Sequence, residues 1–418
     1  MNHSSAPSRW LAYSWLRANE WILVGAILAV YLLTAAVDKD HSYIDPERFR
    51  FCLEDIVRNF ALFGMLALGA MVVIVGGGID LSVGSLVALC AVVLASTMMA
   101  FADPADRFLS DLGAGAVTVA ILVTLATGLI VGTLHAWLVT AIELPPFIAT
   151  LATLVGLRSF ARVLCDYANQ IKYDKPSASD IYVTHPFLSA IKDPWVMLGV
   201  FLSMALVTGA ILKYTVLGRH TYALGGNENA ARLSGIRTGA IKWFVYCYAG
   251  LMGAIAAVFI LARGGGAQPA GQAMGYELTA IAAAVVGGCS LRGGVGTVTG
   301  TVLGALFLRL VIDAINRIID SSADKPEGMI VGVVVVLAVT FTQMRDLMHS
   351  GRRFFPGWQG VFSILAISIA GAMLVMMFST YIPELKPRGG AVGAITFAAI
   401  GLGLAGLKYW ESRRDRLA

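Results

Sequence analysis

Gly76-Gly-Gly-Ile-Asp80-Leu-Ser82-Val-Gly-Ser85 joins two apolar runs of the chain, Phe60 to Val75 and Val83 to Phe101. Each run, with its flanks, is long enough to cross a bilayer as a helix, which takes about 20 residues. A glycine-rich reversal between two such runs predicts a membrane protein in which the chain turns back at this point. It does not indicate a soluble catalytic domain.

A related phrase returns in the second half of the chain. Val73-Ile-Val-Gly-Gly-Gly-Ile-Asp-Leu-Ser-Val-Gly84 is echoed by Val285-Val-Gly-Gly-Cys-Ser-Leu-Arg-Gly-Gly-Val-Gly296, again with apolar runs on both sides. Many transporters are built from internal structural repeats that remain detectable as weak sequence symmetry. The echo therefore predicts an internal repeat of this kind.

The composition also indicates an all-α integral membrane protein. Of the 418 residues, 57% are hydrophobic and 14% are charged, whereas a soluble domain carries about 25% charged residues. The mean hydropathy of +0.75 agrees with this. The net charge of +5 does not indicate nucleic-acid binding, because membrane proteins concentrate Lys and Arg in cytoplasmic loops. The five cysteines are scattered and form no CxxC pair, so neither a metal ribbon nor a disulfide framework is indicated. No metal and no cofactor are predicted.

The apolar runs predict a polytopic helical bundle of twelve spans. Ten spans form a core (residues 21–346), which follows a short leader (1–20) and precedes an extension (347–418) with two further spans and a basic tail. With the leader inside, both termini are cytoplasmic. The predicted spans are 21–37, 56–75, 83–101, 114–139, 146–164, 195–214, 241–262, 277–289, 296–318, 328–343, 361–380 and 390–408.

Charged residues favour this orientation through local clusters. The connection from Lys213 to Lys242 carries five basic residues against the single acid Glu228. Basic clusters beside span ends are typical of the cytoplasmic side. The longest connection predicted outside, Cys165 to Pro194, carries charges of both signs. It is either a docking surface for a soluble partner or a solvated connector.

Sequence motifs of catalysis are missing from the chain. It contains no GxxxxGK[ST] loop for nucleotide phosphates, no HExxH and no GxSxG. An enzyme needs paired reactive groups in one pocket, and few candidates exist here. The chain is therefore expected neither to be an enzyme nor to hydrolyse ATP itself.

Polar residues inside spans are costly, so each carries a functional hypothesis. Arg309, Asp313 and Arg317 lie four residues apart in span nine and hence on one helix face. They either line a pathway for a polar solute or neutralise one another against a neighbouring helix.

Asp80 in the glycine stretch allows a similar pair of interpretations. At the start of a helix it can cap free N–H groups and interact with the positive end of the dipole. Ser82 and Ser85 add hydrogen-bond donors nearby. Alternatively, Asp80 lies on the pathway or takes part in coupling. The Gly128 and Gly132 pair in span four indicates close helix packing.

The segment Gly218 to Ile236 predicts a short helix between spans six and seven. Asn227 can cap its start, Glu228 and Arg232 can pair at i,i+4, and Gly235 can end it. A capped helix on the cytoplasmic surface is what a membrane domain would present to a motor subunit. The alternative is a helix that lies in the membrane interface.

Four stretches occur together in one order: Gly77 to Ser85, Leu144 to Leu151, Gly225 to Ile236 and Tyr276 to Leu291. They resemble the signature of permease subunits of bacterial ABC sugar importers, the ribose, xylose, arabinose and galactose class. The resemblance implies the type II importer architecture in the bacterial inner membrane. Two permease subunits, identical or paralogous, would enclose a pathway. A periplasmic binding protein would deliver a monosaccharide, and a separate cytoplasmic ATPase would drive alternating access.

The resemblance also implies roles for particular residues. Asp80, Ser82, Ser85, Tyr276 and Glu277 would lie at helix ends beside the pathway, together with Arg309 and Asp313 if the span-nine charges line it. The region that couples to the ATPase would comprise Gly225, Gly226, Asn227, Glu228, Ala231, Arg232 and Gly235. The two apolar runs after residue 346 exceed the usual family core and are expected to be accessory spans.

The alternative function is secondary transport. In that case Asp80 or Asp313 would couple the movement of a small polar solute to protons, because intramembrane carboxylates form such relays. The two hypotheses differ in the source of energy, which is nucleotide hydrolysis in one and an ion gradient in the other.

Overall fold

The computed structural model describes residues 9–38, 40, 42–174, 179–319, 332–333, 336, 355, 357–379 and 386–417. In these residues ten helices are long and apolar enough to cross a membrane, which confirms the polytopic all-α fold. The predicted span 328–343 lies almost wholly outside the described residues. The chain divides into two compact units, residues 1–314 with 328–335 and residues 315–327 with 336–418. The predicted domain boundary at residue 346 stays a prediction.

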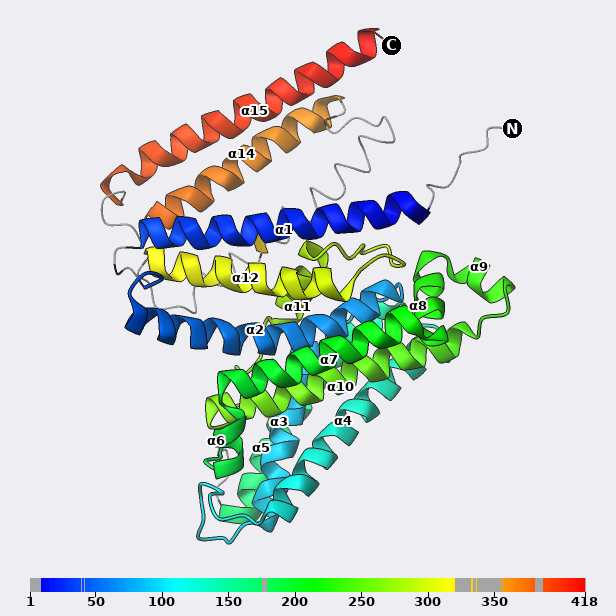
Figure 1. Cartoon of the computed structure of the whole chain (residues 1–418), viewed down its shortest axis with the longest axis vertical. Helices are drawn as coiled ribbons and strands as arrows, with labels where there is room; N and C mark the ends of the chain where they lie inside the picture. Colours follow the sequence, from blue (N-terminus) through cyan, green and yellow to red (C-terminus); the bar gives the residue numbers. More distant parts are fainter. Residues whose placement is uncertain are drawn as a thin grey trace. The chain divides into compact units, whose positions relative to one another are not determined.

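The order of elements follows the apolar runs of the sequence (Figure 1). The elements are α1 (Arg9–Val37), α2 (Pro46–Val75), α3 (Val83–Phe101), α4 (Ala114–Thr140), α5 (Pro146–Tyr173), β1 (Ile181–Tyr182), α6 (Pro186–Ile191), α7 (Pro194–Tyr214), α8 (Val216–Gly226), α9 (Glu228–Leu233), α10 (Thr238–Gly264), β2 (Gly266–Ala267), α11 (Tyr276–Val286), α12 (Val298–Ile319), α14 (Gly357–Ser379), η1 (Lys386–Arg388) and α15 (Gly389–Leu417).

Several helices are longer than predicted; α1 begins at Arg9 and α15 continues to Leu417, and the two cases in which polar segments become helical are α2 and α5. α2 begins at Pro46 rather than near residue 56, because the Asp45 carboxylate accepts a hydrogen bond from the Glu47 N–H at 3.0 Å and proline suits the first turn. α5 continues to Tyr173, past the predicted end near residue 164. The polar residues of these two segments are therefore helical, and their assignment to connections is wrong.

The interior of the first unit is formed by α2, α3 and α10. In their most apolar windows 94%, 78% and 78% of the residues are buried, against 28%, 22% and 28% in α4, α5 and α7. The outer helices therefore keep an apolar face for lipid, while the inner helices are packed on all sides. A Cβ on Gly128 of α4 would collide with the Gly250 carbonyl oxygen of α10. This confirms the predicted packing role of the Gly128 and Gly132 pair.

One end of the first unit, termed the β1 end, is held together by hydrogen bonds between connections. The Thr184 N–H donates to the Phe108 carbonyl oxygen at 2.8 Å, and β1 pairs antiparallel with β2. Within the 102–113 connection, hydrogen bonds led by that from the Asp111 N–H lower the pKa of the Asp106 carboxyl below its ordinary value. The connections predicted to share one side of the membrane therefore lie together.

The opposite end is termed the α8 end. There α8 and α9 lie beyond the ends of α7 and α10 (Figure 1). The turn after α2 and the turn before α12 reach α8 at the same end. These connections are also predicted to share one side, so the predicted alternation is confirmed for the connections between α2 and α12.

Two helices begin within the bundle rather than at its surface. The chain after the glycine turn runs along α5, where the Thr150 hydroxyl donates to the Ile79 carbonyl oxygen at 3.2 Å, before α3 begins. α11 starts at Tyr276, whose ring packs against Phe63 in the middle of α2 with centroids 4.7 Å apart. The 11-residue α11 matches the predicted short eighth span. Interrupted helices of this kind surround the binding sites of many transporters.

The second unit contains α14 and α15, which form an antiparallel hairpin. Ser368 of α14 lies beside Gly401 of α15, and Met376 lies beside Gly393. Both helices are long and apolar enough to span a membrane. They confirm the last two predicted spans.

Candidate functional site

The α8 end is built around five glycines, termed the glycine junction: Gly77, Gly225, Gly226, Gly293 and Gly294. Gly77, Gly293 and Gly294 have φ angles of +83°, +88° and +72°, a region that residues with a side chain disfavour. The Gly294 N–H donates to the Val75 carbonyl oxygen at 2.9 Å. A Cβ on Gly225 would collide with that oxygen and with the Gly294 nitrogen. Three backbone segments therefore approach more closely than a side chain would permit.

The two related sequence phrases meet in this junction. Gly77 belongs to the first phrase, and Gly293 belongs to the second. A Cβ on Gly293 would meet both the Gly225 carbonyl oxygen and the Gly77 Cα. One residue of α8 thus contacts both phrases through backbone atoms. A displacement of α8 would therefore move both phrases through direct backbone contact, without a flexible side chain between them.

The predicted capped helix is present as α9. The Asn227 side chain accepts a hydrogen bond from the Ala230 N–H at 3.0 Å, and Gly235 follows the last turn with a φ of +83°. Ala231 is buried, whereas Leu233 is 90% exposed. Both predicted helix signals are confirmed, and α9 exposes the apolar side chain of Leu233.

Glu228 pairs with a different residue from the one predicted. Its carboxylate lies 2.6 Å from the Lys242 ammonium of α10, while Arg232 donates to Asn229 at 3.2 Å. The predicted i,i+4 pair of Glu228 and Arg232 is therefore wrong. The reason is tertiary: the chain reverses after the six-residue α9, and the first turn of α10 reaches the start of α9.

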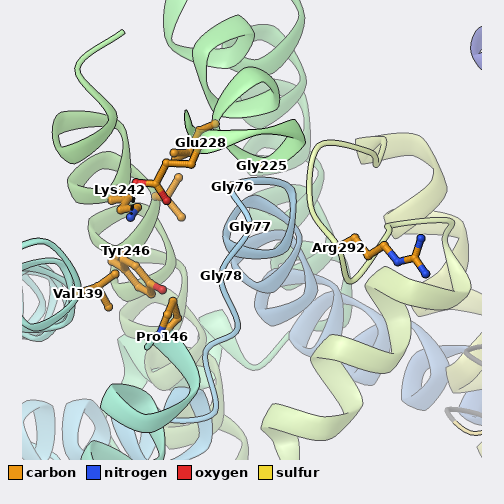
Figure 2. Close-up of a pocket in the computed structure, with 12 residues that line it drawn as sticks. Gly76, Gly77, Gly78, Val139, Pro146, Gly225, Glu228, Lys242, Tyr246 and Arg292 are labelled. Atoms are coloured by element: carbon orange, nitrogen blue, oxygen red, sulfur yellow. Dashed lines mark ion pairs between the residues drawn. The ribbon is translucent and has the colours of Figure 1, made fainter. Parts of the chain in front are cut away.

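A cavity of about 240 Å³ lies beside the glycine junction. Glu228 and Lys242 lie together on one side of the Gly76–Gly78 turn, and Arg292 lies on the other side and points away (Figure 2). The Tyr246 hydroxyl points toward the turn and Pro146 (Figure 2). The volume is below the range of about 300–1,000 Å³ that is typical of pockets for drug-sized ligands. The cavity can hold water or a small polar group.

Asp80 is buried between the glycine turn and α3. Its Oδ1 accepts hydrogen bonds from the Ser82 N–H at 2.8 Å and from the Ser82 hydroxyl at 2.7 Å. Asp80 is not the N-cap residue of α3, which is Ser82; the Asp80 carboxylate instead satisfies the free N–H of Ser82 in the turn before the helix. The Ser85 hydroxyl donates to the Leu154 carbonyl oxygen of α5 at 2.6 Å.

The first turn of α11 lies against the first turn of α3. A Cβ on Gly84 would collide with the Ala273 carbonyl oxygen and the Glu277 carboxylate. Arg158 of α5 donates to the Gln272 carbonyl oxygen at 2.5 Å, and it is the cationic neighbour of Glu277. The structure thus brings together a group of polar residues within the helical bundle, termed the central polar region: Asp80, Ser82, Ser85, Arg158, Tyr276 and Glu277.

Arg309 and Asp313 have other neighbours. Arg309 donates to Asp55 of α2 at 2.5 Å and lies 3.8 Å from Asp313. The Tyr43 hydroxyl donates to Asp313 at 2.7 Å. These four residues, termed the charge cluster, lie beside apolar residues of α1, α2 and α12 that include Leu310. The contacts favour mutual neutralisation over a pathway lining.

Arg158 and Tyr246 are two of the site residues that are not predicted from the sequence. Arg158 is an arginine inside a predicted span, and the cost of an intramembrane charge is a signal that points to it. Tyr246 carries no such signal, because tyrosine is common in membrane helices. Only its surroundings in the folded chain distinguish it.

Comparison with known proteins gives one family and a group of relatives. Residues 52–344 match the family described as "Branched-chain amino acid transport system / permease component". The chain is 35% identical to the Ribose import permease protein RbsC of Haemophilus influenzae over 327 residues, which cover 77% of this chain and 94% of that protein. It is 32% identical to RbsC of Bacillus subtilis over 325 residues, with coverages of 77% and 93%.

A second kind of relative is named for a different cargo. The Autoinducer 2 import system permease protein LsrC of Photorhabdus luminescens is 32% identical over 286 residues, which cover 68% of this chain and 78% of that protein. The family match ends at residue 344. Helices α14 and α15 therefore lie beyond the matched part.

Proposed function

This chain belongs to the branched-chain amino acid transport system / permease component family, and from that premise we propose that it forms the translocation pathway of an ATP-driven importer. The cargo is a monosaccharide or a related small polar solute. A periplasmic binding protein delivers the solute, and a separate cytoplasmic ATPase supplies the energy. The similarity to permeases for ribose and autoinducer 2 import over most of the chain supports this cargo class.

The glycine junction is the observation that carries the proposal. The coupling region comprises Gly225, Gly226, Asn227, Glu228, Ala231, Arg232 and Gly235. Its support is the contact of Gly225 with both related phrases, together with the surface position of α9. An ATPase that moves α8 and α9 would thereby move the segments that lead into α3 and α12. This is how a chain that is not itself an enzyme can be driven.

The central polar region is the proposed solute-facing part. Support comes from two interrupted helices that begin inside the bundle, since such helix starts direct N–H groups and positive dipole ends toward polar solutes. Arg158 and Glu277 add charged groups of opposite sign beside the first turn of α3. A polar solute would find hydrogen-bond partners there in place of water.

The proposed arrangement places the α8 end in the cytoplasm and the β1 end in the periplasm. The basic connection around α9 supports this side for the α8 end. Both termini are then cytoplasmic, in the inner membrane of a bacterium. A second permease, either a copy of this chain or a paralogue, completes the pathway.

Reconstitution in vesicles tests the proposal. The permease is inserted into proteoliposomes with its ATPase bound at the α8 end. The binding protein and labelled ribose are added on the opposite side of the membrane, at the β1 end. The expected result is uptake that requires ATP and both partners and that is insensitive to a protonophore. A permease inserted without the ATPase serves as the control.

The opposite result would establish the alternative function. Uptake by the permease alone that collapses with a protonophore would identify a secondary transporter. Asp80 and Asp313 would then be the first carboxylates to replace with asparagine.

A further inference from the structure

The hydroxyl of Tyr246 has no hydrogen-bond partner among the described residues. The residue is 2% exposed, so bulk water does not satisfy the hydroxyl either. Buried hydroxyl groups are nearly always paired, because the unpaired state loses the hydrogen bonds that water would provide. The hydroxyl lines the cavity, where a water molecule can occupy its hydrogen bond, and it is available to exchange that water for a protein acceptor in another conformation.

The surroundings of the hydroxyl contain acceptors. A Cβ on Gly78 would lie 2.6 Å from the Tyr246 oxygen, which places the hydroxyl against the backbone two residues before Asp80. Asp80 lies near enough to interact electrostatically with Tyr246 and with His135. His135 packs edge-on against the Tyr246 ring, with centroids 6.2 Å apart, and its Nε2 is bonded to Thr153 at 2.7 Å. A small shift of α10 against the Gly78–Asp80 turn would bring the hydroxyl to a carbonyl or carboxylate oxygen.

Helix α10 connects this hydroxyl to the surface helices. Lys242 and Tyr246 lie four residues apart and therefore on one face of α10. Lys242 is bound to Glu228 of α9 at 2.6 Å. Lys242 and Tyr246 line the same cavity. The cavity leaves space for this face of α10 to move. A pull on α9 would reach Tyr246 through one ion pair and one helical turn.

We propose that Tyr246 is a positioning residue whose hydroxyl donates a hydrogen bond to the Gly78–Asp80 turn in the second conformation of the transport cycle. Movement of α9 draws α10 along through the Glu228–Lys242 ion pair, and the new hydrogen bond sets the start of α3. The hydroxyl stabilises only the second conformation, so it shifts the equilibrium between the two. The inference rests on the proposed function and extends it from the surface helices to the central polar region.

Tyr248 provides a matched control on the same helix. It is also buried, but its hydroxyl is hydrogen-bonded to the Thr208 hydroxyl. Replacing either tyrosine with phenylalanine removes one oxygen atom and keeps the ring. The two substitutions therefore differ in whether a hydrogen bond of the present conformation is lost.

The experiment compares Tyr246→Phe and Tyr248→Phe in the reconstituted importer. For Tyr246→Phe we expect an unchanged or higher melting temperature, because no bond of the present conformation is lost. We also expect an approximately fivefold lower maximal uptake rate, an unchanged KM for the delivered solute, and ATP hydrolysis that falls less than uptake. For Tyr248→Phe we expect a lower melting temperature and a normal uptake rate per folded molecule.

Three results would overturn the inference while the wild-type importer remains ATP-driven. The first is an uptake rate of Tyr246→Phe equal to that of the wild type. The second is a lower uptake rate that is explained by a lower melting temperature of the variant. The third is a changed KM of Tyr246→Phe for the delivered solute at an unchanged maximal uptake rate. The last result would mean a direct contact with the solute. A wild-type permease that shows no ATP-dependent uptake would instead reject the proposed function.

A second variant tests the geometry itself. Gly78→Ala places a methyl group against the Tyr246 oxygen, so it should reduce uptake in the wild-type background. The same change should be better tolerated together with Tyr246→Phe, which removes that oxygen. Equal effects in both backgrounds would show that the hydroxyl does not face the turn during transport, and would overturn the inference.

Discussion

The glycine junction and the charge cluster both join residues that are distant in the sequence, but they do so with opposite means. In the junction, Gly225 and Gly294 meet through backbone atoms alone. In the cluster, Arg309 meets Asp55 through side-chain atoms, guanidinium to carboxylate. Backbone atoms cannot adopt another rotamer, whereas an arginine side chain can. The junction is therefore suited to transmitting movement, and the cluster is suited to neutralising charge within the membrane.

The difference predicts different responses to substitution. At Gly225 of the junction, the steric clash of one added carbon decides the outcome. In the cluster, the balance of charge decides it. The three predictions below test this contrast, in order of decreasing effect.

Gly225→Ala should have the largest effect. The added Cβ collides with the Val75 carbonyl oxygen and the Gly294 nitrogen, and neither can move without shifting a helix end. We expect a destabilisation of about 3 kcal/mol, at the upper end of the range for overpacking, and a loss of transport. Thermal unfolding and vesicle uptake measure the two effects.

Gly226→Ala is the control one residue further along α8. Among the described residues, a Cβ on Gly226 would meet nothing within 4 Å. Alanine also favours the helix relative to glycine by about 1 kcal/mol, so stability should be kept or raised. Equal damage by both substitutions would contradict a role for close backbone approach.

Arg309→Ala should have the next largest effect, and mainly on stability. It removes the guanidinium from between Asp55 and Asp313, and Arg309 is largely buried. We expect a loss of about 2–3 kcal/mol, on the low side for a broken buried pair because the Asp55 side chain is 39% exposed. Uptake per folded molecule should stay near the wild-type value.

Arg50→Ala on α2 is the matched control for this prediction. Arg50 pairs with Glu54 at 3.2 Å, but its side chain is 81% exposed. Removal of such a surface pair should cost no more than about 0.5 kcal/mol. If Arg309→Ala abolished uptake by a normally folded protein, the cluster would belong to the pathway and the contrast would fail.

Glu228→Gln should have the smallest effect on stability. The Glu228 side chain is 45% exposed, so solvent screening reduces the ion pair with Lys242 to a few tenths of a kcal/mol. Uptake should nevertheless fall, because the pair connects α9 to α10. Exchange of the two charges, Glu228→Lys with Lys242→Glu, should restore part of the uptake. If Glu228→Gln took up solute at the wild-type rate, or if the charge exchange restored none of a lost uptake, the ion pair with α10 would not belong to the coupling path.

Features that depend on neighbouring residues are well predicted by the sequence. The spans follow from runs of apolar residues, and the start and end of α9 follow from Asn227 and Gly235. The partner of Glu228 is predicted wrongly, because a helix-spacing rule selects Arg232 and ignores the return of α10. The start of α3 at Val83 is as predicted, but its N-cap residue is Ser82, and Asp80 accepts the Ser82 N–H in the turn before the helix.

The sequence by itself determined that this chain is a multi-pass α-helical membrane protein with two related glycine phrases and a capped surface helix. Hydropathy and capping depend on residues close together in the chain, so they are visible before folding. Only the tertiary structure decided that the two phrases meet on Gly225, that Asp55 neutralises Arg309, and that Tyr246 faces the turn before Asp80. Those relations join residues far apart in the sequence, and they arise from how the helices pack.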